Sequence, residues 1–181
     1  MSVLAKRYGE GLFSLALEKN KVAEYKEQID FVKITFDESN VLPFIKSYKV
    51  SKEEKKDLVK NAFDKHVDQY VLNFLFLLID KDRMAYYDDI FDEFHKLCNE
   101  QLKIKEGIIE TARELDEESI KKLEKALSDG EYTVVLKPKI NKDLISGFRV
   151  TIEEKVIDNT MKQRIKQMEE ILKRKDGVYG A

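Results

Sequence analysis

Hydrophobic and polar residues follow two different rhythms along this chain. Up to about residue 102, apolar residues return every three or four positions, which is the spacing of one face of an α-helix. Short polar breaks divide this part into about six helices, each of a length that suits a bundle. The breaks fall at residues 20–21, 39–40, 48–51, 64–66 and 80–83. Ser51 and Glu54 have the spacing of a capping box, and Pro43 fits the first turn of the third helix.

After residue 103 the helical rhythm gives way to short β-rich runs. Asp116 is placed to cap a helix that reaches about Ser128 and ends at Gly130, while Pro138 is expected to stop the second strand. The predicted strands cover residues 107–112, 132–136, 148–152 and 156–157. An Asp-Asn-Thr start signal then begins a closing helix, whose apolar stripe is Met161, Ile165, Met168, Ile171 and Leu172.

These two rhythms predict a mainly α protein with a small α/β part. A bundle of about six helices should occupy residues 1–104. A small domain with the order strand, helix, strand, hairpin, helix should occupy residues 105–181.

The first and fifth predicted helices carry more apolar surface than one core requires. In the first helix, apolar and small residues cover an arc of roughly 240°, whereas a single core needs only about 100°. Ala5, Gly9 and Ala16 form a small stripe in this arc that lets another helix approach closely. In the fifth helix, Asn73 is the one polar residue within 71–79. Either the bundle surrounds a central helix, or the two helices leave an apolar groove for a partner helix.

Composition excludes several classes of protein. The net charge is −2 over 181 residues and is evenly spread, which disfavours a nucleic-acid partner. No apolar run approaches the ~18 residues that would span a membrane. A single cysteine, Cys98, suits a reducing cytoplasm and is interpreted as a small core residue.

No catalytic or cofactor-binding constellation is visible. The Gly9–Gly11 pair lacks the preceding strand that a dinucleotide site needs, and no phosphate-binding loop motif occurs. The group of Asp88, Asp89, Asp92, Glu93 and His95 is interpreted as an exposed acidic face rather than a metal site. We therefore expect no catalytic residue, cofactor or metal. The alternatives are a small α/β enzyme with an unrecognised site and an RNA-binding module, the latter disfavoured by the balanced charge.

Three segments in order resemble the δ subunit of bacterial F-type ATP synthases (OSCP in mitochondria). Residues 144–160 contain Leu-Ile-Ser-Gly-Phe-Arg-Val followed by Val-Ile-Asp-Asn-Thr, similar to the C-terminal signature of that family. Residues 7–13 read Arg-Tyr-Gly-Glu-Gly-Leu-Phe, where the family has Arg-Tyr-Ala-x-Ala-Leu-Phe. Residues 73–83 resemble a third family segment. Ser146 and Asn159 replace family glycines, so we expect local turn adjustments.

The resemblance implies a non-catalytic subunit of the peripheral stalk, at the cytoplasmic face of the cell membrane without inserting into it. It would connect the α/β catalytic head to the b-subunit stalk in proton-driven ATP synthesis. The N-terminal bundle would bind the N-terminal helix of an α subunit, and the C-terminal domain would meet the C-terminus of the b subunit. The candidate residues for the α subunit are Leu4, Ala5, Tyr8, Gly9, Leu12, Phe74, Leu75 and Leu78. Those for the b subunit are Phe148, Val150, Val156, Ile157, Ile165 and Met168.

Overall fold

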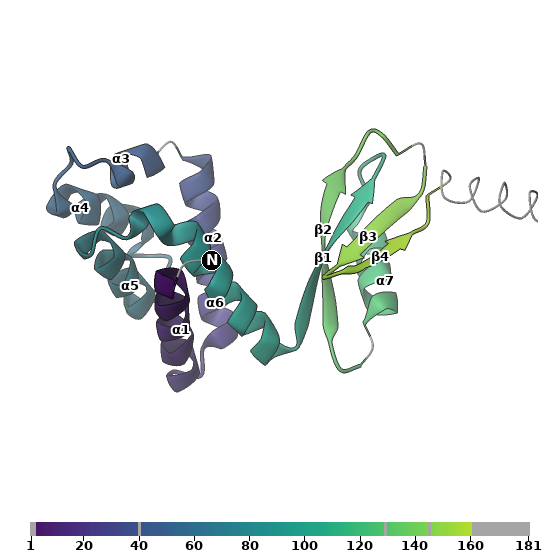
Figure 1. Cartoon of the computed structure of the whole chain (residues 1–181), viewed down its shortest axis with the longest axis horizontal. Coiled ribbons are helices and arrows are strands. Elements are labelled where there is room, and N and C mark those ends of the chain that lie inside the picture. The colour runs from purple at the N-terminus through teal and green to yellow at the C-terminus, as the bar shows by residue number, and fades with distance from the viewer. Residues whose placement is uncertain (1–2, 40, 129, 145, 161–181) are drawn as a thin grey trace, which may run out of the picture. The chain divides into compact units, whose positions relative to one another are not determined.

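The computed structural model describes residues 3–39, 41–128, 130–144 and 146–160. The chain divides into two compact units, Met1–Leu102 and Lys103–Ala181 (Figure 1). The described residues of each unit form a separate hydrophobic core.

The described part of the first unit contains six α-helices, as the apolar spacing predicts. They are α1 (Val3–Glu18), α2 (Val22–Glu38), α3 (Leu42–Lys46), α4 (Lys52–Phe63), α5 (Gln69–Asp80) and α6 (Tyr87–Leu102), with the short 3-10 helix η1 (Met84–Tyr86) before α6. The capping box is confirmed, because the Ser51 hydroxyl accepts the backbone N–H of Glu54 and the Glu54 carboxylate accepts that of Ser51. Pro43 lies in the first turn of α3.

Aromatic side chains from three helices meet edge to face in the bundle core. The ring centroids of Phe36 and Phe63 lie 5.4 Å apart, and those of Phe36 and Tyr87 lie 5.7 Å apart. Buried aromatic pairs of this geometry contribute about 1 kcal/mol each beyond their burial. They hold α2, α4 and α6 together, so that α1 and α5 are supported from within the bundle.

The second unit is a mixed sheet with one described helix. Its elements are β1 (Ile104–Thr111), α7 (Glu117–Leu127), β2 (Thr133–Ile140), β3 (Phe148–Ile152) and β4 (Lys155–Asp158). The strand order is β2-β1-β3-β4; β1 and β2 are parallel, and the other pairs are antiparallel. Parallel neighbours need a crossover, which α7 supplies. The predicted fold class is confirmed in this described part.

One face of the sheet packs against α7. Ile109 and Val150 are fully buried there, and Ile120, Leu123 and Leu127 of α7 pack against the same cluster. The Asp116 carboxylate accepts the backbone N–H of Ser119 at 2.9 Å, which confirms the predicted helix cap. Residues at alternate positions face the other side of the sheet.

The end of the second strand differs from the sequence prediction. Strand β2 continues through Pro138 to Ile140, although Pro138 was expected to end it. Because β2 is an edge strand, the missing N–H of Pro138 need not interrupt a ladder of hydrogen bonds. Helix α7 ends at Leu127 with Ser128 as its C-cap, in agreement with the predicted end, and Gly130 adopts a positive φ of 84° in the loop beyond it. The predicted closing helix lies outside the described residues.

Candidate functional site

An apolar groove runs between α1 and α5 on the surface of the first unit. Its volume is about 420 Å³, which is within the range of pockets that bind small ligands. It is lined by Arg7, Tyr8, Gly11, Leu12, Leu15, Tyr70, Asn73, Phe74 and Leu77. The two helices with excess apolar surface therefore share one concave surface.

Contacts between the two helices form the floor of this groove. Tyr8 of α1 and Phe74 of α5 meet edge to face, with ring centroids 6.4 Å apart. Leu12 is almost completely buried beneath them. These side chains pack against the core of the bundle on one side and line the groove on the other.

The start of α5 is held by Asp68. Its carboxylate accepts the backbone N–H of Tyr70 and a hydrogen bond from the Lys21 ammonium, both at 2.9 Å. The backbone N–H of Asp68 donates to the Gln28 side chain at 2.7 Å. The hydrogen bond from Tyr70 and the pairing with Lys21 lower the pKa of the Asp68 carboxyl below its ordinary value. Asp68 thus ties the α5 wall of the groove to Lys21, the residue just before α2, and to Gln28 of α2.

The groove retains space for a further group. A Cβ added to Gly11 would meet no described atom within 4 Å, although this residue lies in the groove lining. Tyr70 and Leu77 on the opposite wall are both partly exposed. Arg7 is also part of the lining, so the apolar groove includes one cationic residue among those described.

The small-residue stripe of α1 faces α6 of the same chain. A Cβ at Gly9 would lie 2.9 Å from the Cβ of Glu93 and 3.1 Å from the carbonyl oxygen of Ile90. Ala5 and Ala16 are completely buried. The close approach that the stripe permits is therefore made by α6. Glu93 is also buried, so it does not belong to the exposed acidic face predicted for its neighbours.

The sequence-predicted residues divide between groove and core. Tyr8, Leu12 and Phe74 line the groove, whereas Leu4 is partly buried beside the core. Ala5, Gly9, Leu75 and Leu78 are buried within the bundle. Sequence reasoning omitted Arg7, Gly11, Leu15, Tyr70, Asn73 and Leu77, although Gly11 and Leu15 belong to the wide apolar arc of α1.

The second unit has a partly apolar sheet face that no described helix covers. Val156 is 58% exposed and Ile108 is 45% exposed, and both pair with Thr151 across the sheet. The three residues form a row on the face opposite α7. Val150 is fully buried and Phe148 is partly buried on the α7 side; Ile157 is exposed on edge strand β4. Ile165 and Met168 lie outside the described residues.

Ion pairs lie on both sides of this row. The Arg149 guanidinium donates to the Asp158 carboxylate at 3.0 Å, and the Lys137 ammonium lies 2.6 Å from Glu106. Hydrogen bonds from Thr160, together with the Arg149 contact, lower the pKa of the Asp158 carboxyl. The polar margin around an apolar strip is typical of surfaces that contact other proteins.

The described residues offer no catalytic arrangement. No group of three or more acidic, histidine or cysteine side chains is placed to hold a metal ion within the ranges that the structure describes. Cys98 is completely buried, and burial raises its pKa to about 12, which keeps it a neutral thiol. None of the described helices is both long enough and apolar enough to cross a membrane.

A helical bundle with an apolar groove and a mixed sheet with an exposed apolar row define a module that binds other proteins. The family model of the ATP synthase delta (OSCP) subunit matches residues 4–172, and the chain belongs to this family. The family comprises non-catalytic structural subunits in the peripheral stalk of F-type ATP synthase. The predicted family and the predicted absence of catalysis by this subunit are thus confirmed.

Relatives and a solved structure agree with this assignment. The ATP synthase subunit delta of Clostridioides difficile is 36% identical over 178 residues, covering 95% of this chain and 97% of that protein. The corresponding subunit of Alkaliphilus oremlandii is 33% identical over 172 residues, covering 94% and 96%. A chain in the Toxoplasma gondii mitochondrial ATP synthase hexamer has the same fold, with a TM-score of 0.69 and 20% identity over 94% of this chain and 98% of that chain.

Proposed function

We propose that the α1–α5 groove binds the N-terminal helix of an α subunit in the catalytic head of ATP synthase. The observation that carries this proposal is an apolar groove with unfilled space beside Gly11. An amphipathic helix inserts apolar side chains at successive turns into such grooves. Leu15 and Leu77, on opposite walls, supply apolar contacts, while Arg7 can pair with an acidic residue of the incoming helix.

The binding energy follows from apolar burial. Each Å² of apolar surface removed from water contributes about 25 cal/mol, against the cost of ordering the peptide. An interface of this kind needs no chemical step. It suits a joint that must stay closed while the rotor turns inside the head.

The second unit is proposed to meet the C-terminus of the b subunit. The row of Ile108, Thr151 and Val156 supports this assignment, because it offers exposed apolar groups inside a margin of ion pairs. With the α subunit on one unit and the b subunit on the other, the chain would link head and stalk at the cytoplasmic face of the membrane. Nothing in this arrangement requires the chain to enter the bilayer.

Calorimetry of the full chain with a synthetic peptide of the α-subunit N-terminus tests the groove. We expect binding with a negative heat-capacity change, because apolar surface is buried. Gly11→Leu should weaken binding by at least about a hundredfold, since its side chain would occupy the groove, an effect of ~2.7 kcal/mol. Wild-type affinity in a folded Gly11→Leu protein would refute the assignment of the groove.

Binding to the soluble part of the b subunit tests the sheet face. Val156→Glu should weaken it by about tenfold or more, because a charge would be buried in the interface. Ile140→Glu is the matched control, since Ile140 is an exposed apolar residue on the other edge strand. Equal effects of the two substitutions would locate the b contact elsewhere.

A further inference from the structure

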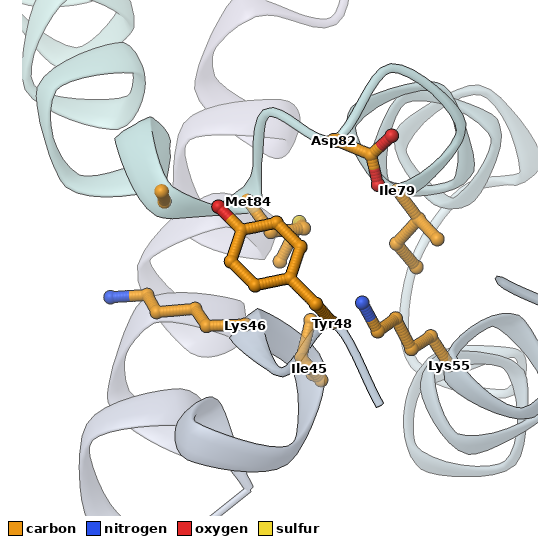
Figure 2. A pocket seen from close by; sticks show the side chains of 8 residues that line it. Ile45, Lys46, Tyr48, Lys55, Ile79, Asp82 and Met84 are labelled. Atoms are coloured by element: carbon orange, nitrogen blue, oxygen red, sulfur yellow. The ribbon is translucent and has the colours of Figure 1, made fainter. Parts of the chain in front are cut away.

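A second, smaller pocket lies on the first unit where α3, α4, the end of α5 and η1 meet (Figure 2). It is lined by Ile45, Lys46, Tyr48, Lys55, Ile79, Asp82, Met84 and Ala85. Its volume is about 30 Å³, which leaves room for only one or two small groups the size of a water molecule. None of its lining residues belongs to the lining of the α1–α5 groove.

Lys55 is the unusual residue of this pocket. It is only 6% exposed, and within the described residues its ammonium has neither a hydrogen bond nor an ion pair. Figure 2 shows its side chain pointing from α4 into the pocket, between Tyr48 and Ile79. The nearby Asp82 carboxylate attracts this ammonium but accepts no hydrogen bond from it, so an acceptor supplied by a ligand would stabilise the charge.

The neighbouring carboxylates are already engaged by other lysines of α4. The Lys52 ammonium lies 2.7 Å from Asp82, and the Lys56 ammonium lies 2.6 Å from Asp80. Three lysines of α4 therefore share two aspartates here, and the remaining charge is the positive charge of Lys55.

Lys46 does not share this role. Its ammonium lies 4.8 Å from the centre of the Tyr87 ring, and in Figure 2 its side chain extends away from Lys55. Asp82 also lines the pocket, but its carboxylate is paired with Lys52, so the Lys55 ammonium is the charged group whose donors are unused. The complementary group is an anion, and it must be small.

The size of the pocket also limits the source of that anion. A carboxylate head fills it, so the rest of the ligand must lie outside on the surface. There, Tyr48 is 94% exposed at the rim, and exposed aromatic side chains are enriched where proteins meet. We propose that this pocket receives the carboxylate of an acidic side chain from a partner protein, which pairs with Lys55 as a charge-assisted hydrogen bond.

Nuclear magnetic resonance of the full chain tests this site with blocked tripeptides. The probes are acetyl-Gly-Glu-Gly-amide, its glutamine counterpart and acetate. The glutamate peptide should shift the Lys55 ammonium and the amides of Asp82 and Met84 in a saturable way. The glutamine peptide should bind at least about tenfold more weakly, because it lacks the charge. Acetate should bind more weakly than the glutamate peptide, since it cannot contact Tyr48.

Variants separate the pocket from general charge effects. Lys55→Met should abolish the response of the Asp82 and Met84 amides, whereas Lys60→Met, at an exposed lysine of the same helix, should preserve it. Lys55→Gln serves the same purpose if the methionine variant does not fold. Equal shifts with both peptides, or none at tens of millimolar peptide, would overturn the carboxylate site. Acetate binding as tightly as the glutamate peptide would overturn the role of a partner protein.

Discussion

The two sides of α1 both carry glycine among apolar residues, but one side packs tightly against α6 and the other lines an open groove. Gly9 lies where α6 approaches so closely that a Cβ would be 2.9 Å from Glu93 Cβ. Gly11, two residues later, has no described atom within 4 Å of the same added carbon. One glycine is needed for packing inside the bundle, and the other leaves a groove unfilled. A glycine in a helix therefore marks a site of close contact only when the structure shows what faces it.

Gly9→Leu should have the largest effect on stability. The new side chain would overlap Glu93 and the backbone of Ile90, and overpacking of this kind costs about 3 kcal/mol or more. Urea denaturation followed by the helical circular dichroism signal measures the loss. Gly11→Leu, the matched control, should change the unfolding free energy by less than about 1 kcal/mol. Equal stability of the two variants would remove the distinction between the two sides of α1.

Asp68→Ala should have the second-largest effect on stability, because it removes the contacts that hold the start of α5 in place. Loss of the helix cap and of the Lys21 pair should cost about 1–2 kcal/mol at pH 7. Asp64→Ala is the control, since Asp64 is exposed and caps no helix start. The same variant should weaken α-peptide binding, whereas the control should not.

The effect of Asp68→Ala should depend on pH. The pKa of Asp68 is lower in the folded protein than in the unfolded chain, so its contribution is fully present above the unfolded value. That contribution falls away as the pH drops below about 4 and through the folded pKa. Denaturation of both proteins at several pH values should show the difference shrinking in acid. A difference that stays constant would mean that Asp68 stabilises the fold through packing alone.

Local signals in the sequence explain why the elements were predictable. The capping box at Ser51 and the cap at Asp116 are complete within four residues, so their structure does not depend on the rest of the fold. The two excess apolar faces likewise predicted which helices form the groove. The sequence does not single out the wall residues Tyr70 and Leu77. Helix α5 is apolar on nearly all sides, so its sequence alone does not show which side chains face the groove and which face the core.

The same limit explains the errors. Gly9 and Gly11 look alike in sequence, and only the position of α6 tells them apart. Glu93 belongs to an acidic run, yet its place on α6 turns it toward α1. Pro138 predicts a strand end by its residue type, but β2 tolerates it as an edge strand, and the edge position is a property of the whole sheet. Each error concerns what lies opposite a residue, which depends on tertiary packing.

Replacing each of the two glycines with alanine should change stability the least, and it tests the difference between the two sides of α1 most directly. Gly11→Ala should raise stability by up to about 1 kcal/mol, because alanine favours the helix and its Cβ has free space. Gly9→Ala should lower stability despite the same gain in helix propensity, because the Cβ meets Glu93 and Ile90. Urea denaturation of both variants and of the wild type measures whether each substitution raises or lowers the free energy of unfolding. The same sign in both would mean that α6 can move away from α1 at little cost, and the filled side would then be as adaptable as the groove.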